Sequence, residues 1–377
     1  MNLIRLEAII RKEFYHLIRD YRSLYLAFAI PLILIILFGY ALNLDVNNVE
    51  TVIIDHDKTE LSRDFLSKIS ASPYFHVSAY LNETKTAVDY LDHNLTMAVI
   101  IIPPGFMKNI RADRDATMQI IIDGSDPNFA GIIRGYLTAI SEQYNQKLLL
   151  NFLNRQGLSK INPPVDGRIR VWFNEDLESR NFIIPGIIAI IIMIVGALLT
   201  SLVIAREYEN GTMETIKSLP VKAIEFYLGK AIPYFFIALT DVLIAMIFGQ
   251  ILFGIVMKGN FWLMLTATSL YILVAVSLGL FISNVTKSQM LANQMAILTT
   301  YLPSLLLSNY VFPIINMPTF LQYITYVGPA RYYIEILTGI YLRNVGFAYL
   351  WPSMTVLFLF FMVLSALNYR ILKKEGL

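Results

Sequence analysis

The sequence reads NFIIPGIIAIIIMIVGALLTSLVIA from residue 181 to 205 and continues at once as REYENGTME from 206 to 214. The first part carries no charge and is long enough to cross the roughly 30 Å hydrocarbon core of a bilayer as a helix. The second part is dense in charges of both signs, and Pro220 soon follows it. A simple anchor needs only a few Lys or Arg at this point. The junction therefore favours a membrane subunit with a polar surface that binds a partner.

The composition places the whole chain among membrane proteins. Hydrophobic residues make up 56% of it, charged residues 15%, and the mean hydropathy is +0.57, well above the balance of soluble domains. The formal net charge of +2 gives no reason to expect a nucleic-acid partner. The absence of cysteine excludes disulfides and cysteine-bound zinc. His56, His76 and His93 share no metal-ligand spacing, so we expect no metal site.

Windows without charge, or nearly so, predict six membrane-spanning helices. They lie at 23–44, 181–205, about 229–257, between Lys258 and Lys287, at about 289–312 and at about 350–370. The first window is too long for the apolar part of a signal peptide and lacks a cleavage site of small residues. The uncharged stretch 288–330 is too long for one crossing, and prolines divide it. We therefore expect short helices in the outer leaflet at about 313–345.

Lys and Arg predict the orientation of these helices. They are concentrated before the first window, between the second and third, and after the sixth: Arg5, Arg11, Lys12, Arg19, Arg22, Arg206, Lys217, Lys222, Arg370, Lys373 and Lys374. Loops rich in Lys and Arg stay in the cytoplasm. Both termini are therefore predicted to be cytoplasmic, with residues 45–180 outside.

Residues 45–180 predict one α/β domain. Runs rich in Val, Ile and aromatic residues indicate strands at 49–55, 74–80, 97–102, 117–123 and 168–173. Helical patterns separate them at about 59–70, 83–93, 104–112 and 128–155. Strands that alternate with helices favour a partly parallel sheet with helices packed on it. The predicted fold class is thus a polytopic α-helical membrane protein of six transmembrane helices with an inserted α/β extracytoplasmic domain.

Residues 1–22 predict an amphipathic helix on the cytoplasmic side. Apolar residues recur on one helical face: Leu3, Leu6, Ile10, Phe14 and Leu17. Such a helix lies along the inner leaflet, in contact with membrane lipids. A plain orientation signal is the alternative, although charge alone would not need the apolar stripe.

The polar loop 206–226 predicts a second cytoplasmic helix, which is short. Thr212 can cap its N-terminus, and Glu214 in its first turn complements the helix dipole. Its apolar side holds Met213, Ile216 and Leu219. Pro220 ends it, and a two-turn helix is marginal alone in water. It therefore packs either against the chain's own membrane helices or against a separate cytosolic protein.

Asp241 lies inside the third predicted span. Insertion scales put a carboxylate at the centre of a bilayer at a cost of about 2.5–3.5 kcal/mol. The expected role is a structural hydrogen bond to a hydroxyl group, such as that of Thr240 or of a Tyr on a neighbouring helix. Contact with a cationic substrate or a proton is the alternative.

Several motifs, in order along the chain, resemble those of one transporter family. They are Arg11-Lys12-Glu13, Pro31, FGYALNL (38–44), DGSDPN (123–128), FIIPG (182–186), Arg206-Glu207-x-Glu209-x-Gly211-Thr212-x-Glu214 with Pro220, and Pro329-Ala330-Arg331-Tyr332. Together they resemble ABC-2 type transporter permeases over the whole chain. Among these they are most similar to the subgroup with a large extracytoplasmic domain between the first two spans, described as drug or lipophile efflux permeases.

The resemblance implies a permease subunit that exports a hydrophobic or amphipathic compound, drug-like or lipid, from the cytoplasm or inner leaflet. It implies a dimer of identical or paralogous permeases with two ATPase subunits, which bind the ATP and magnesium. The chain itself has no GxxxxGK[ST] phosphate loop, so we expect neither enzymatic activity nor a cofactor in it. A periplasmic adaptor is a further candidate partner, and the resemblance implies a location in the inner membrane of a bacterium.

In this family the loop after the second span supplies a coupling helix that fits a cleft in the ATPase. Carried to this sequence, the ATPase-coupling candidates are Glu207, Glu209, Gly211, Thr212 and Glu214. The run SLPVK (218–222) differs from the commonest sequence motif of the family at this place. Which residues contact the ATPase is therefore open by one or two positions.

Three other classes of protein are the alternatives. A secondary transporter would show internal repeats and several ionisable groups within its spans. A sensor would need a cytosolic output domain, and no predicted cytoplasmic segment is long enough. A non-transporting ABC-2 component that transmits force to the envelope or handles lipid is the third.

Overall fold

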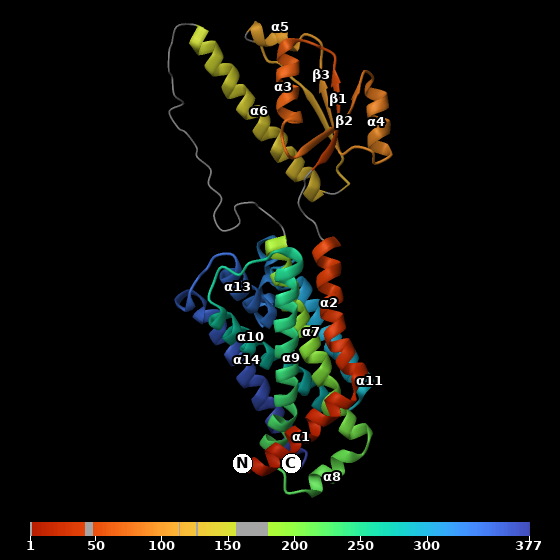
Figure 1. Cartoon of the computed structure of the whole chain (residues 1–377), viewed down its shortest axis with the longest axis vertical. Helices are drawn as coiled ribbons and strands as arrows, with labels where there is room; N and C mark the ends of the chain where they lie inside the picture. The colour runs from red at the N-terminus through yellow and green to blue at the C-terminus, as the bar shows by residue number, and fades with distance from the viewer. Residues whose placement is uncertain (1, 42–47, 113, 126, 156–179) are drawn as a thin grey trace. The chain divides into compact units, whose positions relative to one another are not determined.

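The computed structural model describes residues 2–41, 48–112, 114–125, 127–155 and 180–377 (Figure 1). The chain divides into two compact units. A helical unit comprises Met1–Asn43 and Val171–Leu377, and an α/β unit comprises Leu44–Arg170.

The helical unit is built from long helices joined by short turns. Its elements are α1 (Leu3–Arg19), α2 (Tyr21–Ala41), α7 (Arg180–Glu209), α8 (Thr212–Ser218), α9 (Ala223–Phe253), α10 (Phe261–Thr286), α11 (Gln289–Leu306), η1 (Ile314–Asn316), α12 (Thr319–Ile324), η2 (Thr325–Val327), α13 (Pro329–Tyr341) and α14 (Phe347–Lys374). Four of the described helices, α7, α9, α10 and α14, are long and apolar enough to cross a membrane. In α2 the apolar part that is described, Phe28–Tyr40, is shorter.

Three predicted boundaries are wrong, all where a helix and its apolar stretch end at different places. Helix α7 continues beyond residue 205 to Glu209, and α9 begins at Ala223 rather than at 229. The predicted loop 206–226 is therefore shorter, from 210 to 222, and α8 occupies its middle. Helix α11 ends at Leu306 rather than at 312. At α7 and α9 the backbone hydrogen bonding carries the helix beyond its apolar stretch, whereas α11 ends before its apolar stretch does.

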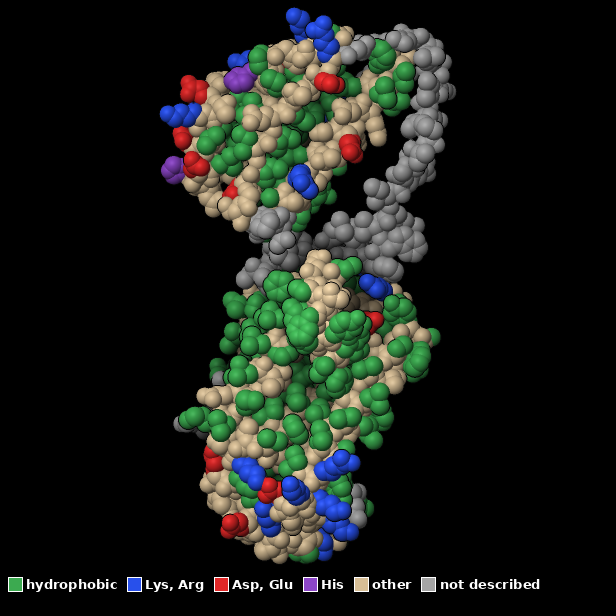
Figure 2. Space-filling model, turned by 180° about the vertical axis from the view of Figure 1, so that it is seen from behind, with side chains coloured by type: hydrophobic (Ala, Val, Ile, Leu, Met, Phe, Trp, Pro, Cys, Tyr) green, Lys and Arg blue, Asp and Glu red, His purple; other side chains and the backbone are tan. Residues whose placement is uncertain are grey.

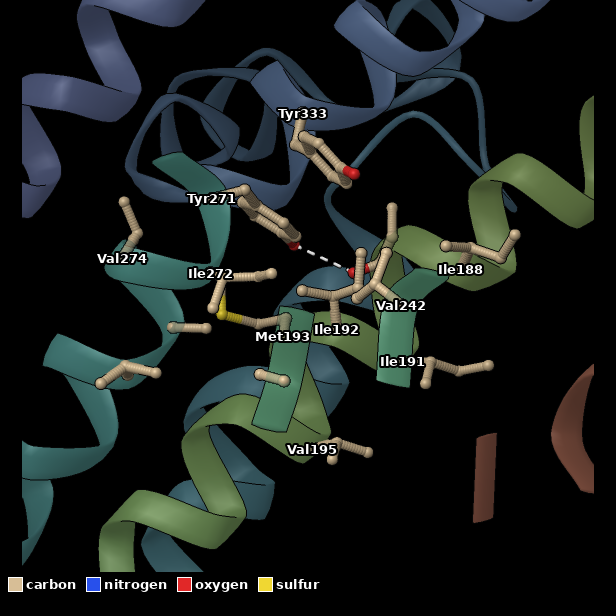
Figure 3. Packing of buried hydrophobic residues seen from close by; sticks show 14 of the residues in the cluster. Ile188, Ile191, Ile192, Met193, Val195, Val242, Tyr271, Ile272, Val274 and Tyr333 are labelled. Atoms are coloured by element: carbon tan, nitrogen blue, oxygen red, sulfur yellow. Dashed lines mark hydrogen bonds between the residues drawn. The ribbon is translucent and has the colours of Figure 1, made fainter. Parts of the chain in front are cut away.

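Helix α7 forms the centre of this unit and is apolar on nearly all sides, as expected of a buried helix. Figure 3 shows its residues Ile188, Ile191 and Ile192 among side chains of neighbouring helices. The ring of Tyr271 (α10) stacks on that of Tyr333 (α13), with 4.0 Å between ring centroids. The Tyr271 hydroxyl donates to the Ala189 carbonyl of α7 at 3.2 Å (Figure 3). The buried Tyr271 hydroxyl is thus paired, as buried polar groups generally are.

Charged side chains of the helical unit gather at one end. On the face seen in Figure 2, apolar side chains cover the middle of this unit, and Lys, Arg, Asp and Glu cluster at its lower end. Both chain termini, α1 and α8 lie at that same end (Figure 1). An apolar middle with most of the charge at one end is typical of a protein that lies in a bilayer.

The α/β unit holds a four-stranded sheet. Its strands are β1 (Val49–Asp55), β2 (Phe75–Leu81), β3 (Ala98–Ile102) and β4 (Gln119–Ile122), in the order β2-β1-β3-β4. The first three are parallel, and β4 is antiparallel to β3. One face packs against α3 (Glu60–Ser70), α5 (Phe106–Arg111) and α6 (Pro127–Arg155), and the other against α4 (Thr84–Asp92). The predicted strand 168–173 lies outside the described residues.

We predict that a fragment covering residues 46–178 folds on its own. The unit has an apolar core on each face of its sheet, centred on Ile53 and Ile100 on one side and on Val52 and Val99 on the other. A soluble fragment should therefore give a single cooperative thermal transition, followed by circular dichroism. A fragment that stays unfolded in dilute buffer would show instead that the unit depends on the membrane helices or on a second copy.

The same fragment should lose stability in acid. The ammonium of Lys147 donates to Asp64 at 2.7 Å and lowers the pKa of that carboxyl below its usual value. A carboxyl with a lowered folded-state pKa stabilises the fold fully above its unfolded pKa, and this contribution is lost as the pH falls through the folded one. The melting temperature should therefore drop below about pH 4. In Asp64→Asn this part of the pH dependence should be absent.

Candidate coupling site

Helix α8 begins directly after a left-handed turn. Gly211 precedes it with a φ of 70°, a conformation that glycine adopts without steric cost. The predicted N-cap at Thr212 is wrong: Gly211 is the N-cap and makes no side-chain cap hydrogen bond, while Thr212 is the first helical residue. The Thr212 hydroxyl instead donates to the Glu207 carboxylate at the end of α7. The sequence pattern does not reveal the turn made by Gly211, and this turn moves the start of the helix by one residue.

One side of α8 packs against the chain, and the other is exposed. Met213 is only 2% exposed and belongs to the core of the helical unit. Glu214, Thr215 and Ser218 are exposed, and Leu219 just after the helix is 52% exposed. The chain's own helices therefore hold α8 from one side, and its free side carries polar side chains, while the exposed Leu219 directly follows the helix.

Glu207 points into the protein rather than towards a partner. Its carboxylate lies 2.6 Å from the Lys230 ammonium of α9 and 2.7 Å from that of Lys12 in α1. The same Lys230 ammonium lies 2.6 Å from the Glu13 carboxylate of α1. Lys230 and Glu13 are 2% and 3% exposed, and Glu207 is 8% exposed. These four residues, which we name the Lys230 cluster, join α1, α7 and α9.

Helix α1 packs across α9 next to the Lys230 cluster. A Cβ added to Gly229 would lie 2.4 Å from Cγ2 of Ile9, so only glycine allows this approach. The Arg5 guanidinium donates to the Pro220 carbonyl beyond α8. The backbone N–H of Asn2 donates to Glu225 at 2.6 Å. Between α1 and the end of α8 a pocket of about 360 Å³ remains, with Leu219 on its wall.

The residues of the predicted apolar face of α1 divide between the core and the surface of the helical unit. Of its five residues Leu6 and Leu17 are buried, whereas Leu3 and Phe14 are 70% and 48% exposed. The buried face also holds the Glu13 carboxylate. Hydrophobic periodicity missed this face because its central residue is charged and becomes buried only through its ion pair with Lys230.

A second group of charges holds the other end of α8. Lys217 lies 3.3 Å from Glu375, which follows α14, and Lys287 between α10 and α11 pairs with the same carboxylate. The Tyr208 hydroxyl donates to Glu375 at 3.0 Å. The hydrogen bond from Lys287 lowers the pKa of Glu375 below its usual value. We name these four residues the Glu375 cluster.

Glu209 occupies a different place again. It is exposed, and it accepts a hydrogen bond at 2.8 Å from the backbone N–H of Gln289, in the first turn of α11. A carboxylate at this position complements the dipole of α11. Of the five candidates, Gly211 and Thr212 thus shape the turn, Glu207 and Glu209 pair within the chain, and Glu214 alone has an exposed side chain on the free side of α8.

The two clusters connect α8 to the long helices. Thr212 of α8 donates to Glu207 of the Lys230 cluster, whose residues lie in α1, α7 and α9. Lys217 of α8 belongs to the Glu375 cluster, which reaches the ends of α10 and α14. Sequence reasoning missed Glu13, Lys230 and Glu375. Of these, Lys230 lies inside the predicted third span. A lysine within a span indicates a buried charge with a partner, and this was the signal available in the sequence.

Asp241 lies in α9 with 3% of its surface exposed. The hydrogen bond predicted for it does not form among the described residues, and the hydroxyl of the neighbouring Thr240 donates to Phe236. Within the same residues no group of three His, Asp or Glu side chains could hold a metal ion.

Comparison with known proteins gives the family. The family of ABC-2 family transporter proteins matches residues 22–370. The chain is 33% identical, over 97% of its length and 94% of the other's, to the probable multidrug ABC transporter permease YbhS of Escherichia coli (strain K12). It is 31% identical to the probable multidrug ABC transporter permease YbhR of the same strain, over 93% of each chain. The inner membrane transport permease YhhJ of that strain is 24% identical over 82% of this chain and 81% of its own. The chain therefore belongs to the ABC-2 family of transporter permeases.

Proposed function

We propose that this chain is the membrane-spanning subunit of an ATP-driven exporter of hydrophobic or amphipathic compounds. Its relatives YbhS and YbhR are named probable multidrug permeases, which supports export of drug-like molecules. ATP hydrolysis is assigned to partner ATPase subunits, because the chain has no phosphate-binding loop. The assembly is a permease dimer with two ATPases in the inner membrane of a bacterium.

In this proposal α2, α7, α9, α10, α11 and α14 are the six membrane-spanning helices. Both termini and α8 face the cytoplasm, and the α/β unit and the short elements from η1 to α13 face outward. The position of α1, α8 and both termini at the charged end of the helical unit supports this orientation (Figure 1).

The observation that carries the proposal is the way in which α8 is attached to the long helices. It has one exposed side with Glu214, the exposed Leu219 follows it, and ion-paired clusters attach its other side to α1, α9, α10 and α14. A short helix held in this way transmits force from a bound protein to the membrane helices. This is what coupling to an ATPase requires, and a passive anchor would not need it.

The proposal is tested with inside-out membrane vesicles that contain the chain and its ATPase. Adding ATP should drive lipophilic dyes into the vesicles, and an ATPase variant lacking its phosphate-loop lysine should not. The same vesicles without this chain give the background rate. If the assembled complex hydrolyses ATP yet moves no compound of a broad dye and lipid panel, the non-transporting alternative holds.

In the same assay, Asp241→Asn should impair export of cationic dyes and spare neutral ones. The carboxylate is buried, and no group among the described residues donates a hydrogen bond to it. The hydrogen bond expected for a structural role is therefore missing. A carboxylate within a span is most often part of a substrate or proton path. Asparagine keeps the shape and removes the charge. Equal export of both dye types by a normally assembled variant would contradict this role.

A further inference from the structure

At one edge of the α/β unit's sheet, two neighbouring strands have their connections on opposite faces. The chain leaves the carboxyl end of β1 towards α3 on one face, and it leaves the neighbouring β2 towards α4 on the opposite face. In open α/β sheets, ligands bind in crevices outside the carboxyl ends of the strands. Here a crevice lies between α3 and the ends of β1 and β2.

An irregularity in β2 turns a tyrosine towards this crevice. The pairing of β1 with β2 shifts by one residue between Thr51 and Val52. Before the shift Val77 packs on the α3 side, and after it Ala79 and Leu81 pack on the α4 side. Tyr80, the partner of Ile53, therefore faces α3, and it is 65% exposed. Bulges of this kind often stand beside binding sites, where they redirect a side chain.

The crevice contains a pocket of about 720 Å³. Leu66 and Ala71 contribute apolar surface, and Lys58, Arg63 and Tyr80 also line it. This volume falls within the range of about 300–1,000 Å³ that small-molecule sites occupy.

The free charges of the pocket are positive. Its carboxylate, Asp55, accepts hydrogen bonds from the backbone N–H groups of Asp57 and Lys58 at 3.0 Å and from the Ser62 hydroxyl at 2.8 Å. Neither Lys58 nor Arg63 forms an ion pair among the residues that the structure describes. Lys58 is held at a φ of 52°, a left-handed conformation that is uncommon for lysine and recurs at ligand sites. Two unpaired cations beside an aromatic ring fit an anionic group carried on a flat apolar body.

We infer that this pocket binds an organic anion, a carboxylate or phosphate attached to an aromatic or aliphatic body. Lys58 and Arg63 hold the anionic group, and Tyr80 and Leu66 contact the apolar body. The site belongs to the α/β unit alone, and the inference holds whether or not the chain is an exporter.

The chain has no cysteine, so a single introduced thiol can report on the pocket in the full-length protein in detergent. Ser67→Cys places the thiol on the pocket wall, and Thr138→Cys on the exposed side of α6 serves as control. The rate of labelling by N-ethylmaleimide is measured with and without 1-naphthoate. The neutral analogue 1-naphthylmethanol is run in parallel.

We expect 1-naphthoate to slow labelling of Ser67→Cys in a saturable manner and to leave Thr138→Cys unchanged. The neutral analogue should protect about tenfold more weakly, because it lacks the charge-assisted hydrogen bonds. Adding Lys58→Met and Arg63→Met to Ser67→Cys should remove the protection. The matched control Lys68→Met, on the same helix outside the pocket, should keep it.

Two results would overturn the inference. One is the absence of protection at millimolar naphthoate in Ser67→Cys itself. The other is equal protection by the anion and by its neutral analogue, which would show an apolar crevice without an anion site. Neither result bears on ATP-driven export, so failure here is distinct from failure of the proposed function.

Discussion

Lys230→Met should strongly destabilise the helical unit. The variant leaves the carboxylates of Glu13 and Glu207 buried without the cation that lies 2.6 Å from each of them. Breaking a buried ion pair by removing one partner typically costs about 3–5 kcal/mol, since the remaining charge is desolvated and unpaired. Lys12 still reaches Glu207, whereas Glu13 loses its nearest partner. A marked fall in the thermal unfolding temperature in detergent is the expected result.

Two further variants separate the buried cluster from a general effect of losing a lysine. Lys222→Met removes an exposed lysine just before the same helix and should leave the unfolding temperature nearly unchanged. Lys230→Met combined with Glu13→Gln and Glu207→Gln removes all three charges together and should recover much of the lost stability. If Lys230→Met unfolds at the temperature of the unmodified protein, the cluster does not hold α1, α7 and α9 together.

The membrane helices were predictable because a long window without charge is stable chiefly as a helix surrounded by lipid or by other apolar helices. The windows at 181–205 and 350–370 lie within α7 and α14. The strands of the α/β unit were equally clear, and those predicted at 49–55 and 97–102 form β1 and β3. In both cases the signal is a local pattern of apolar residues, and burial of that pattern fixes the element.

The partners of single charges were not predictable in the same way. Glu207 and Glu214 stand close together in one polar run, yet Glu207 is buried against Lys230 and Glu214 is exposed. Glu13 and Lys230 are distant in sequence and meet only because α1 crosses α9 at Gly229. A charge beside a membrane span has the same sequence signature whether it faces a partner protein or pairs within the chain. The register shift in β2 likewise leaves no mark in the alternation of residues 75–81.

Glu214→Lys combined with Leu219→Asp should abolish binding of the ATPase without unfolding the permease. Both side chains are exposed, Glu214 on the free side of α8 and Leu219 directly after the helix, and no side-chain hydrogen bond or ion pair of either is found among the described residues. A reversed charge and a buried aspartate at a protein interface each cost several kcal/mol in affinity when the site is desolvated by the partner. Co-purification of the ATPase and its stimulation by the permease should both be lost.

The contrast with Glu207→Lys makes this prediction specific. That change places a third ammonium beside Lys230 and Lys12 and should lower the unfolding temperature of the permease alone, before any ATPase is added. The double variant at Glu214 and Leu219 should unfold at the unmodified temperature. Glu7→Lys, an exposed charge reversal on α1, controls for the change in net charge and should retain the ATPase. If the double variant still brings down a full complement of active ATPase, α8 is not the surface through which ATP hydrolysis reaches the membrane helices.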